Sequence, residues 1–225
     1  MSYVYMKVLE SAPERYERGM RILTAGRLER VYQDIAARLN PGRGRLDPGA
    51  QVLDVGCGTG ALAVLLAGQG AQVTGIDIAP PMLGQAGERV RAAGLQERVT
   101  LRELAATDLD TAFDDGQFDA VVSTLAFSEL SEDEIAYTLA ECARILQPGG
   151  LLLVADEVLP ESALGRAGTF LLRLPFALAA FVLTQNTTHR VAGLAGQNEA
   201  AGFQLLEVHG YLAGTMKLFV TEKAE

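Results

Sequence analysis

Residues 52–60, VLDVGCGTG, place three alternating glycines directly behind an apolar run that contains one carboxylate. The apolar run is typical of a parallel strand that is buried on both faces of its sheet. Gly56, Gly58 and Gly60 allow the backbone to turn tightly and to approach a ligand where a Cβ would collide. The helix expected over 61–68 would then present unpaired N–H groups and a positive dipole end, which suit a carboxylate or a phosphate. The segment therefore predicts a ligand-binding strand, loop and helix, with a plain strand-to-helix turn as the alternative.

The carboxylate in this run separates two classes of ligand that the glycines leave open. Gly56, Gly58 and Ala61 also satisfy the glycine fingerprint of dinucleotide-binding folds. Asp54 stands two residues before the first glycine, where the pyrophosphate of a dinucleotide would be repelled by about 1 kcal/mol or more. S-adenosylmethionine instead brings an ammonium and a sulfonium, and its carboxylate can use the helix N-terminus. We therefore predict S-adenosylmethionine as the cofactor, with the nicotinamide dinucleotide of an oxidoreductase as the alternative.

Further segments extend the pattern along most of the chain. Together with the glycine loop they resemble, in order, the class I S-adenosylmethionine-dependent methyltransferases from about residue 50 to residue 222. The resemblance implies an α/β fold: a Rossmann-like seven-stranded sheet with a closing antiparallel hairpin, helices on both faces and a helical cap or lid. It also implies an enzyme of the small-molecule type. The segments are 71–78, 99–109, 116–130, 145–155 with its Pro-Gly-Gly turn, 201–208 and 215–221.

Cofactor contacts are expected from the glycine loop and from the end of the second strand. Asp77 lies 23 positions after Asp54, close to the roughly 20-residue offset at which a carboxylate accepts the ribose hydroxyls. In the family, the residue after that acid and a nearby methionine pack around the adenine. Ile78 and Met82 occupy those positions here, and ordinary core roles are the alternative. The loop residues expected to line the cofactor are Asp54, Gly56, Cys57, Gly58 and Gly60.

The third segment departs from the family where an aspartate usually holds the adenine amino group. The resemblance places Ala105 at that position and leaves Asp108, three residues downstream, as a displaced substitute. We expect backbone groups near Ala106 and apolar stacking to recognise the adenine instead. At the end of the fourth strand, the backbone carbonyl of Ser123 is expected to accept a hydrogen bond from the methionine ammonium.

The reaction centre also departs from the family. Small-molecule members often have two histidines where this chain has Ser128 and Glu129, so an obvious catalytic base is missing. A base matters mainly when the acceptor must lose a proton near the transition state. The remaining candidates are Glu129, Asp156, Glu157 and His189, for each of which a surface or capping role is the alternative. No catalytic residue is assigned from the sequence.

An apolar stretch at 169–183 is the least usual part of the chain. Its 15 residues fall short of the roughly 20 that span a bilayer, and Arg173 and Pro175 interrupt it. We interpret it as part of a lid at about 160–195 that favours an apolar or aromatic acceptor, with a buried packing helix as the alternative. The layout of this lid resembles the methyltransferases that act on isoprenoid quinone precursors. An apolar lid of this kind would also allow transient contact of the protein with a membrane surface.

The N-terminal segment is expected to form a helical cap over residues 1–48, ahead of a methyltransferase domain over 49–225. Tyr16 is its expected cofactor contact, and an exposed amphipathic helix is the alternative. The opening residues 3–20 bear a faint resemblance to methyltransferases associated with corrinoid proteins.

Composition excludes several classes of function. A net charge of −9 and a pI near 4.8 disfavour a nucleic-acid substrate, because phosphate backbones are bound by Lys and Arg. Two cysteines and two histidines without ligand spacing predict neither a metal site nor a disulfide framework. Met1 is not followed by an apolar signal segment, so we expect a cytoplasmic protein. The expected partner is a small-molecule acceptor; a non-catalytic cofactor-binding protein is the other alternative, and the oligomeric state is not predicted.

Overall fold

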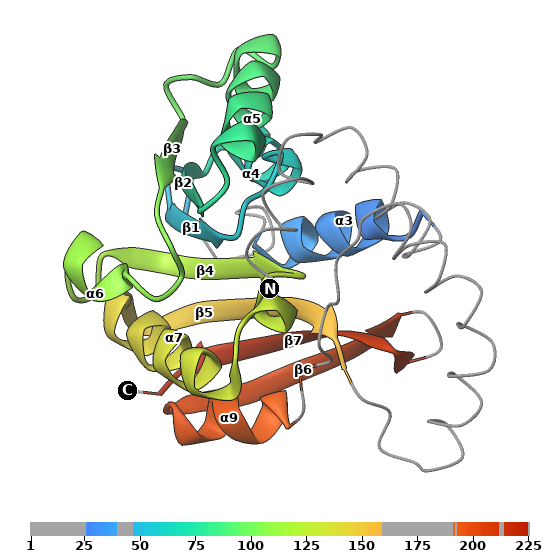
Figure 1. Cartoon of the computed structure of the whole chain (residues 1–225), viewed down its shortest axis with the longest axis vertical. Coiled ribbons are helices and arrows are strands. Elements are labelled where there is room, and N and C mark those ends of the chain that lie inside the picture. Colours follow the sequence, from blue (N-terminus) through green and yellow to red (C-terminus); the bar gives the residue numbers. More distant parts are fainter. Residues whose placement is uncertain (1–25, 40–46, 159–190, 192, 212–213, 225) are drawn as a thin grey trace, which may run out of the picture.

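Seven strands form one mixed sheet in the computed structural model, which describes residues 26–39, 47–158, 191, 193–211 and 214–224. The strand order is β3-β2-β1-β4-β5-β7-β6 (Figure 1). Strands β1 to β5 run parallel, and β7 pairs antiparallel with both β5 and β6. This arrangement confirms the predicted Rossmann-like sheet with its closing hairpin. The strands are β1 (Gln51–Val55), β2 (Gln72–Asp77), β3 (Val99–Glu103), β4 (Phe118–Thr124), β5 (Leu146–Glu157), β6 (Phe203–Tyr211) and β7 (Met216–Lys223).

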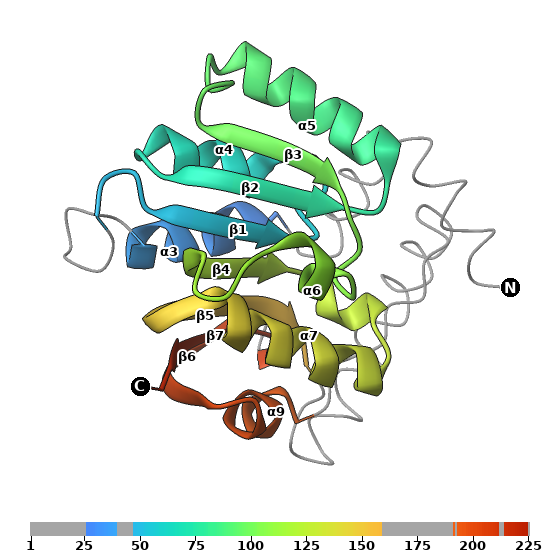
Figure 2. The same ribbon diagram turned by 90° about the vertical axis from the view of Figure 1, so that its left-hand side faces the viewer.

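Helices cover both faces of this sheet, as predicted (Figure 2). One face carries α3 (Leu28–Leu39), α4 (Ala61–Gly68) and α5 (Pro80–Ala92), and the other carries α6 (Leu109–Ala112), α7 (Glu132–Ile145) and α9 (Leu194–Ala200). Alternation along each strand decides which core a side chain joins. In β5, Leu151 and Leu153 face α3, whereas Leu152 and Val154 face α7. Because both faces are covered, the central strands are apolar on both sides.

The carboxyl ends of the parallel strands meet along one edge of the sheet. β1 lies between β2 and β4, so the chain departs from β1 to one side and later reaches β4 on the other. Open α/β sheets bind ligands outside the carboxyl ends of the strands at such a reversal. Asp54, Asp77 and Ser123 lie near this edge on β1, β2 and β4. The fold therefore gathers three predicted cofactor residues from distant segments.

The predicted Pro-Gly-Gly turn is present at residues 148–150, inside the bounds of β5. Between two successive pairings with β4, β5 advances by five residues while β4 advances by two. Gly149 has a φ of +74°, and a Cβ on Gly150 would lie 2.8 Å from the carbonyl oxygen of Gln147. Both glycines are therefore required for the chain to bulge here and still pair on either side.

α3 is the described part of the expected N-terminal cap. Its apolar side is buried against the sheet. Arg38 Nε donates a 3.1 Å hydrogen bond to Glu207 Oε2 of β6, and Tyr211 Oη donates a 2.7 Å hydrogen bond to Asp34 Oδ2. These contacts fix α3 across the hairpin side of the sheet. The rest of the cap, including Tyr16, lies outside the described residues.

Most of the expected lid lies outside the described residues as well, including the apolar stretch 169–183. The chain is described again at Val191, which forms an isolated parallel bridge with Val158. α9 then leads into β6. None of the helices in the described parts of the chain is long and apolar enough to cross a membrane.

Candidate cofactor site

The glycine loop between β1 and α4 is tied to β2 by its backbone. Gly56 N and Cys57 N both donate 2.9 Å hydrogen bonds to Ile76 O. Gly56 has a φ of +70°, and a Cβ there would lie 2.4 Å from Ala126 Cβ in the segment after β4. Gly58 has a φ of +52° with open space where a Cβ would point. Glycine is therefore required at the first position by close approach and at the second by conformation.

α5 braces the same loop. A Cβ on Gly60 would lie 2.9 Å from Ala86 Cβ. Arg89 Nη1 donates hydrogen bonds to Thr59 Oγ1 at 2.9 Å and to Thr59 O at 3.1 Å. These contacts hold the loop at the start of α4. Sequence reasoning missed Thr59 and Arg89, because they are 30 residues apart and no local pattern connects them.

Asp77 lies at the end of β2 with both carboxylate oxygens bonded to backbone. Its Oδ2 accepts from Gly58 N at 2.8 Å, and its Oδ1 accepts from Ala79 N at 2.9 Å. Burial raises the pKa of Asp77, and the hydrogen bonds from Ala79, Gly58 and Ile78 oppose that rise. The two oxygens have about four lone-pair sites in all, so three backbone donors leave at least one site open. The carboxylate is thus oriented by the glycine loop and can still accept the ribose hydroxyls.

Asp54 differs, because no hydrogen bond from the described parts of the chain reaches its buried carboxylate. The residue is 1% exposed, and neither oxygen has a hydrogen-bond partner among the described residues. Burial and the charge of Asp77 raise the pKa of Asp54 to about 7. A buried carboxylate without a partner is strongly destabilising. A cation is the ligand that this position fits, and the ammonium at the methionine end of S-adenosylmethionine is such a cation.

Two polar side chains that sequence reasoning missed lie near Asp54. The hydroxyl of Tyr32 on α3 shares a hydrogen bond with the side chain of Thr124 at the end of β4. Burial of this hydroxyl and the nearby Asp54 charge raise the pKa of Tyr32 well above its usual value. Because α3 precedes the segments that carry the family resemblance, no sequence motif pointed to this contact.

Ser123 is fully buried, and its side chain has a structural role. Its Oγ donates a 3.0 Å hydrogen bond to Val55 O and so joins β4 to β1 next to the glycine loop. Leu125, two residues further, has a φ of +60°, the only positive value of a non-glycine residue in the described parts of the chain. Such strain is concentrated at functional sites. The expected role of the Ser123 carbonyl toward the ammonium stays a prediction.

The residues expected around the adenine differ in exposure. Ile78, directly after the ribose acid, is 47% exposed, whereas Met82 is 6% exposed. Ala106 O accepts a 3.2 Å hydrogen bond from Thr138 Oγ1 of α7, and within the described residues Ala106 N has no partner. Ile78 and the Ala106 N–H are thus available to a ligand, while Met82 is positioned as a core residue.

Asp108 precedes α6 and does not cap that helix with its side chain. Its N–H donates a 3.1 Å hydrogen bond to Ala105 O, but its exposed carboxylate forms no capping bond with α6. The carboxylate therefore stands at the surface beside the expected adenine segment.

Of the candidate bases, Asp156 on β5 is committed to the backbone. It is 0% exposed; its Oδ2 accepts from Ser128 N at 3.0 Å and its Oδ1 accepts from Glu157 N at 2.7 Å. Burial raises the pKa of Asp156 to about 6 against these hydrogen bonds. Glu129 is exposed on the short helix η2 (Phe127–Glu129), and Glu157 is partly exposed. His189 lies outside the described residues.

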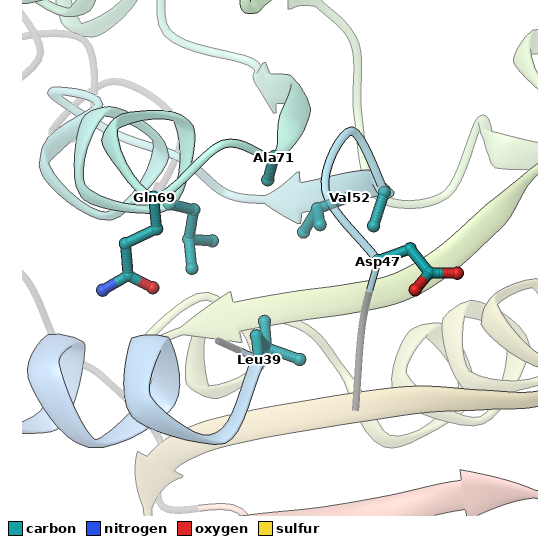
Figure 3. A pocket seen from close by; sticks show the side chains of 7 residues that line it. Leu39, Asp47, Val52, Gln69 and Ala71 are labelled. Atoms are coloured by element: carbon teal, nitrogen blue, oxygen red, sulfur yellow. The ribbon is translucent and has the colours of Figure 1, made fainter. Parts of the chain in front are cut away.

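The hollow shown in Figure 3 lies away from this site. Its lining comes from the end of α3, the entry to β1 and the end of α4, which are at the amino ends of the strands. It has about 10 Å³ of space for the centre of a water molecule, enough for about one water. In the described parts of the chain, no three His, Cys, Asp or Glu side chains group as metal ligands would. Cys57 is buried in the glycine loop, and burial raises the pKa of its thiol.

Comparison with known proteins identifies the class of protein that this fold and site define. A family model described as a methyltransferase domain matches residues 52–150, from β1 to the Pro-Gly-Gly turn. An uncharacterized methyltransferase of Synechocystis is 30% identical over 179 residues, which cover 77% of this chain and 76% of that protein. The chain belongs to the class I S-adenosylmethionine-dependent methyltransferases.

Within this family the chain resembles enzymes of quinone biosynthesis. A demethylmenaquinone methyltransferase of Symbiobacterium thermophilum is 32% identical over 167 residues, which cover 73% of this chain and 63% of that protein. The chain thus spans less than two thirds of the length of this relative. A magnesium protoporphyrin IX methyltransferase of Synechocystis, solved with S-adenosylhomocysteine bound, superposes with a TM-score of 0.73 at 17% identity, covering 94% of both chains. That superposition shows a shared fold.

Proposed function

We propose that this chain binds S-adenosylmethionine at the glycine loop and transfers its methyl group to a small apolar or aromatic acceptor. The observation that carries the proposal is the buried carboxylate of Asp54, whose oxygens have no partner among the described residues. A cationic methionine end supplies the missing partner, whereas the pyrophosphate of a dinucleotide would add negative charge beside Asp54 and Asp77. Family membership also favours the methyltransferase over the oxidoreductase alternative.

We propose roles for the remaining cofactor residues from the described positions and from the family resemblance. Asp77, held by Gly58 N and Ala79 N, accepts the ribose hydroxyls. Ile78 covers one face of the adenine with its exposed side chain, and Ala106 N donates to a ring nitrogen. Tyr16 and the Ser123 carbonyl complete the set together with the loop residues. The other loop members are Gly56, Cys57 and Gly60, and Met82 supports the site from the core.

The protein's part in the reaction is positioning. When bound, S-adenosylmethionine supplies a methyl group on a sulfonium that departs as a neutral thioether. Methyl transfer then requires the acceptor atom about 3 to 3.5 Å from that methyl carbon, with water excluded. The segment after β4, from strained Leu125 to Glu129, lies at the carboxyl edge and forms one wall of this space. Glu129 is the exposed carboxylate there that would take a proton from an acidic acceptor.

A quinone-type acceptor is the preferred substrate class. The relative from Symbiobacterium thermophilum is named for demethylmenaquinone, an apolar aromatic ring system. The apolar stretch 169–183 would line the acceptor space as part of a lid at about 160–195, above a domain over 49–225 that follows the cap over 1–48. We place the protein in the cytoplasm, with transient contact at a membrane surface where such acceptors dissolve.

Calorimetric titration tests the cofactor assignment first. We expect micromolar binding of S-adenosylmethionine and S-adenosylhomocysteine and no binding of NADH. Binding of NADH alone would overturn the proposal. A screen of phenols and quinols, read by mass spectrometry as a gain of one methyl group, then tests the acceptor class.

A second candidate is a cofactor-binding protein that does not catalyse methyl transfer. It is favoured by one observation: the segment that carries two histidines in many small-molecule members has Ser128 here, and Ser128 N is bonded to Asp156. Tight cofactor binding without a methylated product across the acceptor screen would support this candidate.

A further inference from the structure

Tyr32 is a polar group inside the candidate site that the roles above leave unused. Its ring packs against the core between α3 and the sheet. Its hydroxyl is hydrogen-bonded to the Thr124 side chain at the carboxyl end of β4. A phenol placed at a ligand edge, rather than in the middle of a core, is positioned to contact a ligand.

The register of the sheet brings this hydroxyl to the face that carries Asp54. Asp54 pairs with Val122 across β1 and β4, so Thr124, two residues further along β4, points to the same face. α3 covers that face, and Val122 belongs to the core that α3 helps to form. The Asp54 charge also acts on the Tyr32 hydroxyl, since it contributes to the raised pKa of Tyr32. Asp54, Thr124 and Tyr32 therefore lie together on the α3 face of the sheet, at the carboxyl ends of β1 and β4.

The oxygen atoms of these three side chains suit a primary ammonium. An ammonium has three N–H donors, and the Asp54 carboxylate cannot face all of them from one side. The phenol oxygen of Tyr32 has lone pairs that can accept a further N–H, beside the hydrogen bond that it shares with the Thr124 hydroxyl. The Arg89 guanidinium, which also acts on Tyr32, is bonded to Thr59 in the glycine loop.

We propose that Tyr32 Oη is a second acceptor for the ammonium of the cofactor's methionine end, and that Thr124 orients it. This inference rests on the proposed cofactor binding and deepens it. Asp54 supplies the negative charge that pairs with the ammonium. Tyr32 accepts a second N–H of the ammonium from the side on which α3 lies. The cap helix is then part of the cofactor site through a side chain that no family motif marks.

Paired ligands test this role of Tyr32. S-adenosylhomocysteine carries the ammonium, and 5′-methylthioadenosine has the same adenosine and thioether but no amino-acid portion. For Tyr32→Phe, we expect S-adenosylhomocysteine to bind about 10- to 100-fold more weakly, as for a lost hydrogen bond to a charged group, with 5′-methylthioadenosine changed less than about twofold. Tyr137→Phe, at an exposed position of α7, is the control and should change neither.

Thr124→Val provides an independent second variant. It keeps the size of the side chain and removes the hydroxyl that is hydrogen-bonded to Tyr32. We expect a loss in the same direction but smaller, about threefold to tenfold, again confined to S-adenosylhomocysteine. In the double variant with Tyr32→Phe, the loss should not exceed that of Tyr32→Phe alone, because both act through one contact.

Several results would overturn the inference. Equal weakening of both ligands in Tyr32→Phe would mean that Tyr32 acts through packing, and no weakening of either would mean that it makes no contact. If Tyr32→Phe does not fold, an unchanged ratio of the two affinities in Thr124→Val overturns the inference by itself. Failure of the unmodified protein to bind either ligand would instead overturn the proposed function, on which this inference depends.

Discussion

The cofactor half of the sheet edge, around β1 and β2, and the acceptor half, around β4 and β5, each contain a fully buried aspartate. Asp54 on β1 is 1% exposed and Asp156 on β5 is 0% exposed. Asp156 accepts hydrogen bonds from Ser128 N and Glu157 N, whereas neither oxygen of Asp54 has a partner among the described residues. The same side chain, equally buried, is therefore a structural link in one half, whereas in the other half it is left for the ligand that we propose.

This difference shows how a buried charge can be interpreted. Burial is the main cause that raises the pKa of both carboxyl groups, to about 7 for Asp54 and to about 6 for Asp156. The hydrogen bonds distinguish the roles of the two aspartates, because backbone N–H groups already compensate the buried charge of Asp156. In the complex that we propose, the ammonium compensates the Asp54 charge, so this charge favours ligand binding rather than folding.

The largest expected effect is in Asp54→Asn. Loss of the charge that pairs with the ammonium should weaken S-adenosylhomocysteine binding by at least about 100-fold, in line with 3–5 kcal/mol for a broken buried ion pair. The free variant should be more stable than the unmodified protein at pH 8, by about 1–3 kcal/mol, because a destabilising charge is gone. Calorimetric titration and urea unfolding measure the two effects. Asp114→Asn, at an exposed carboxylate, is the control.

Asp156→Ala should produce the opposite pattern. Two backbone N–H groups lose their acceptor, so the free energy of unfolding should fall by about 2–4 kcal/mol. Affinity for 5′-methylthioadenosine should stay within about threefold, because the ribose and adenine contacts lie in the other half of the edge. A large loss of cofactor affinity with unchanged stability would reverse the comparison between the two aspartates.

The pH dependence of cofactor binding separates the two halves further. Asp54 has its folded pKa raised, from 3.8 to about 7, so the ionised form that pairs with the ammonium is available only above about pH 7. Affinity should fall about tenfold for each pH unit below 7 and also fall above about pH 8, where the cofactor's own amino group loses its proton. In Asp54→Asn the acid limb should be flat. Calorimetric titrations of both proteins with the cofactor between about pH 5 and 9 would measure this dependence.

The raised pKa also affects the free protein. For an acid with a raised folded pKa, stability is greatest below the unfolded pKa and is lost as the pH rises through the folded pKa. Ionisation of Asp54 alone should therefore lower the stability of the free protein by about 4 kcal/mol between pH 3.8 and pH 8. Bound cofactor should remove most of this loss.

The smallest expected effect concerns the adenine. Ala105→Asp restores the acceptor that the family usually has for the adenine amino group, and we expect S-adenosylhomocysteine to bind about threefold to tenfold more tightly. Ala105→Asn is the matched variant without the charge. Weaker binding with aspartate would mean that Ala105 does not occupy that position.

Local patterns allowed the sheet and the glycine loop to be predicted. The strand at 51–55, the loop and the helix at 61–68 follow from apolar runs and glycine positions, and the structure has the same bounds. The hairpin of β6 and β7 was equally predictable. Contacts between distant segments were not. Thr59 meets Arg89 only when α5 packs on the loop, and Tyr32 reaches Thr124 only when α3 covers the sheet.

The candidate bases show the same limit. Sequence position places Glu129 and Glu157 at the carboxyl edge, where both lie. Sequence alone could not show that Asp156 is buried and bonded to backbone, because its partner Ser128 is 28 residues away. The orientation of a side chain at a strand end depends on the neighbouring loop. The conformation of that loop depends on how the loop packs against distant parts of the chain.

The contact between Gly56 and Ala126 limits how this protein can change over evolutionary time. A Cβ on Gly56 would lie 2.4 Å from Ala126 Cβ, so the two positions must vary together. A lineage that enlarges Ala126 to reshape the acceptor space would first have to move the loop that holds the cofactor. New substrate preferences are therefore expected to arise from residues beyond Ala126, while Gly56 and Ala126 remain small.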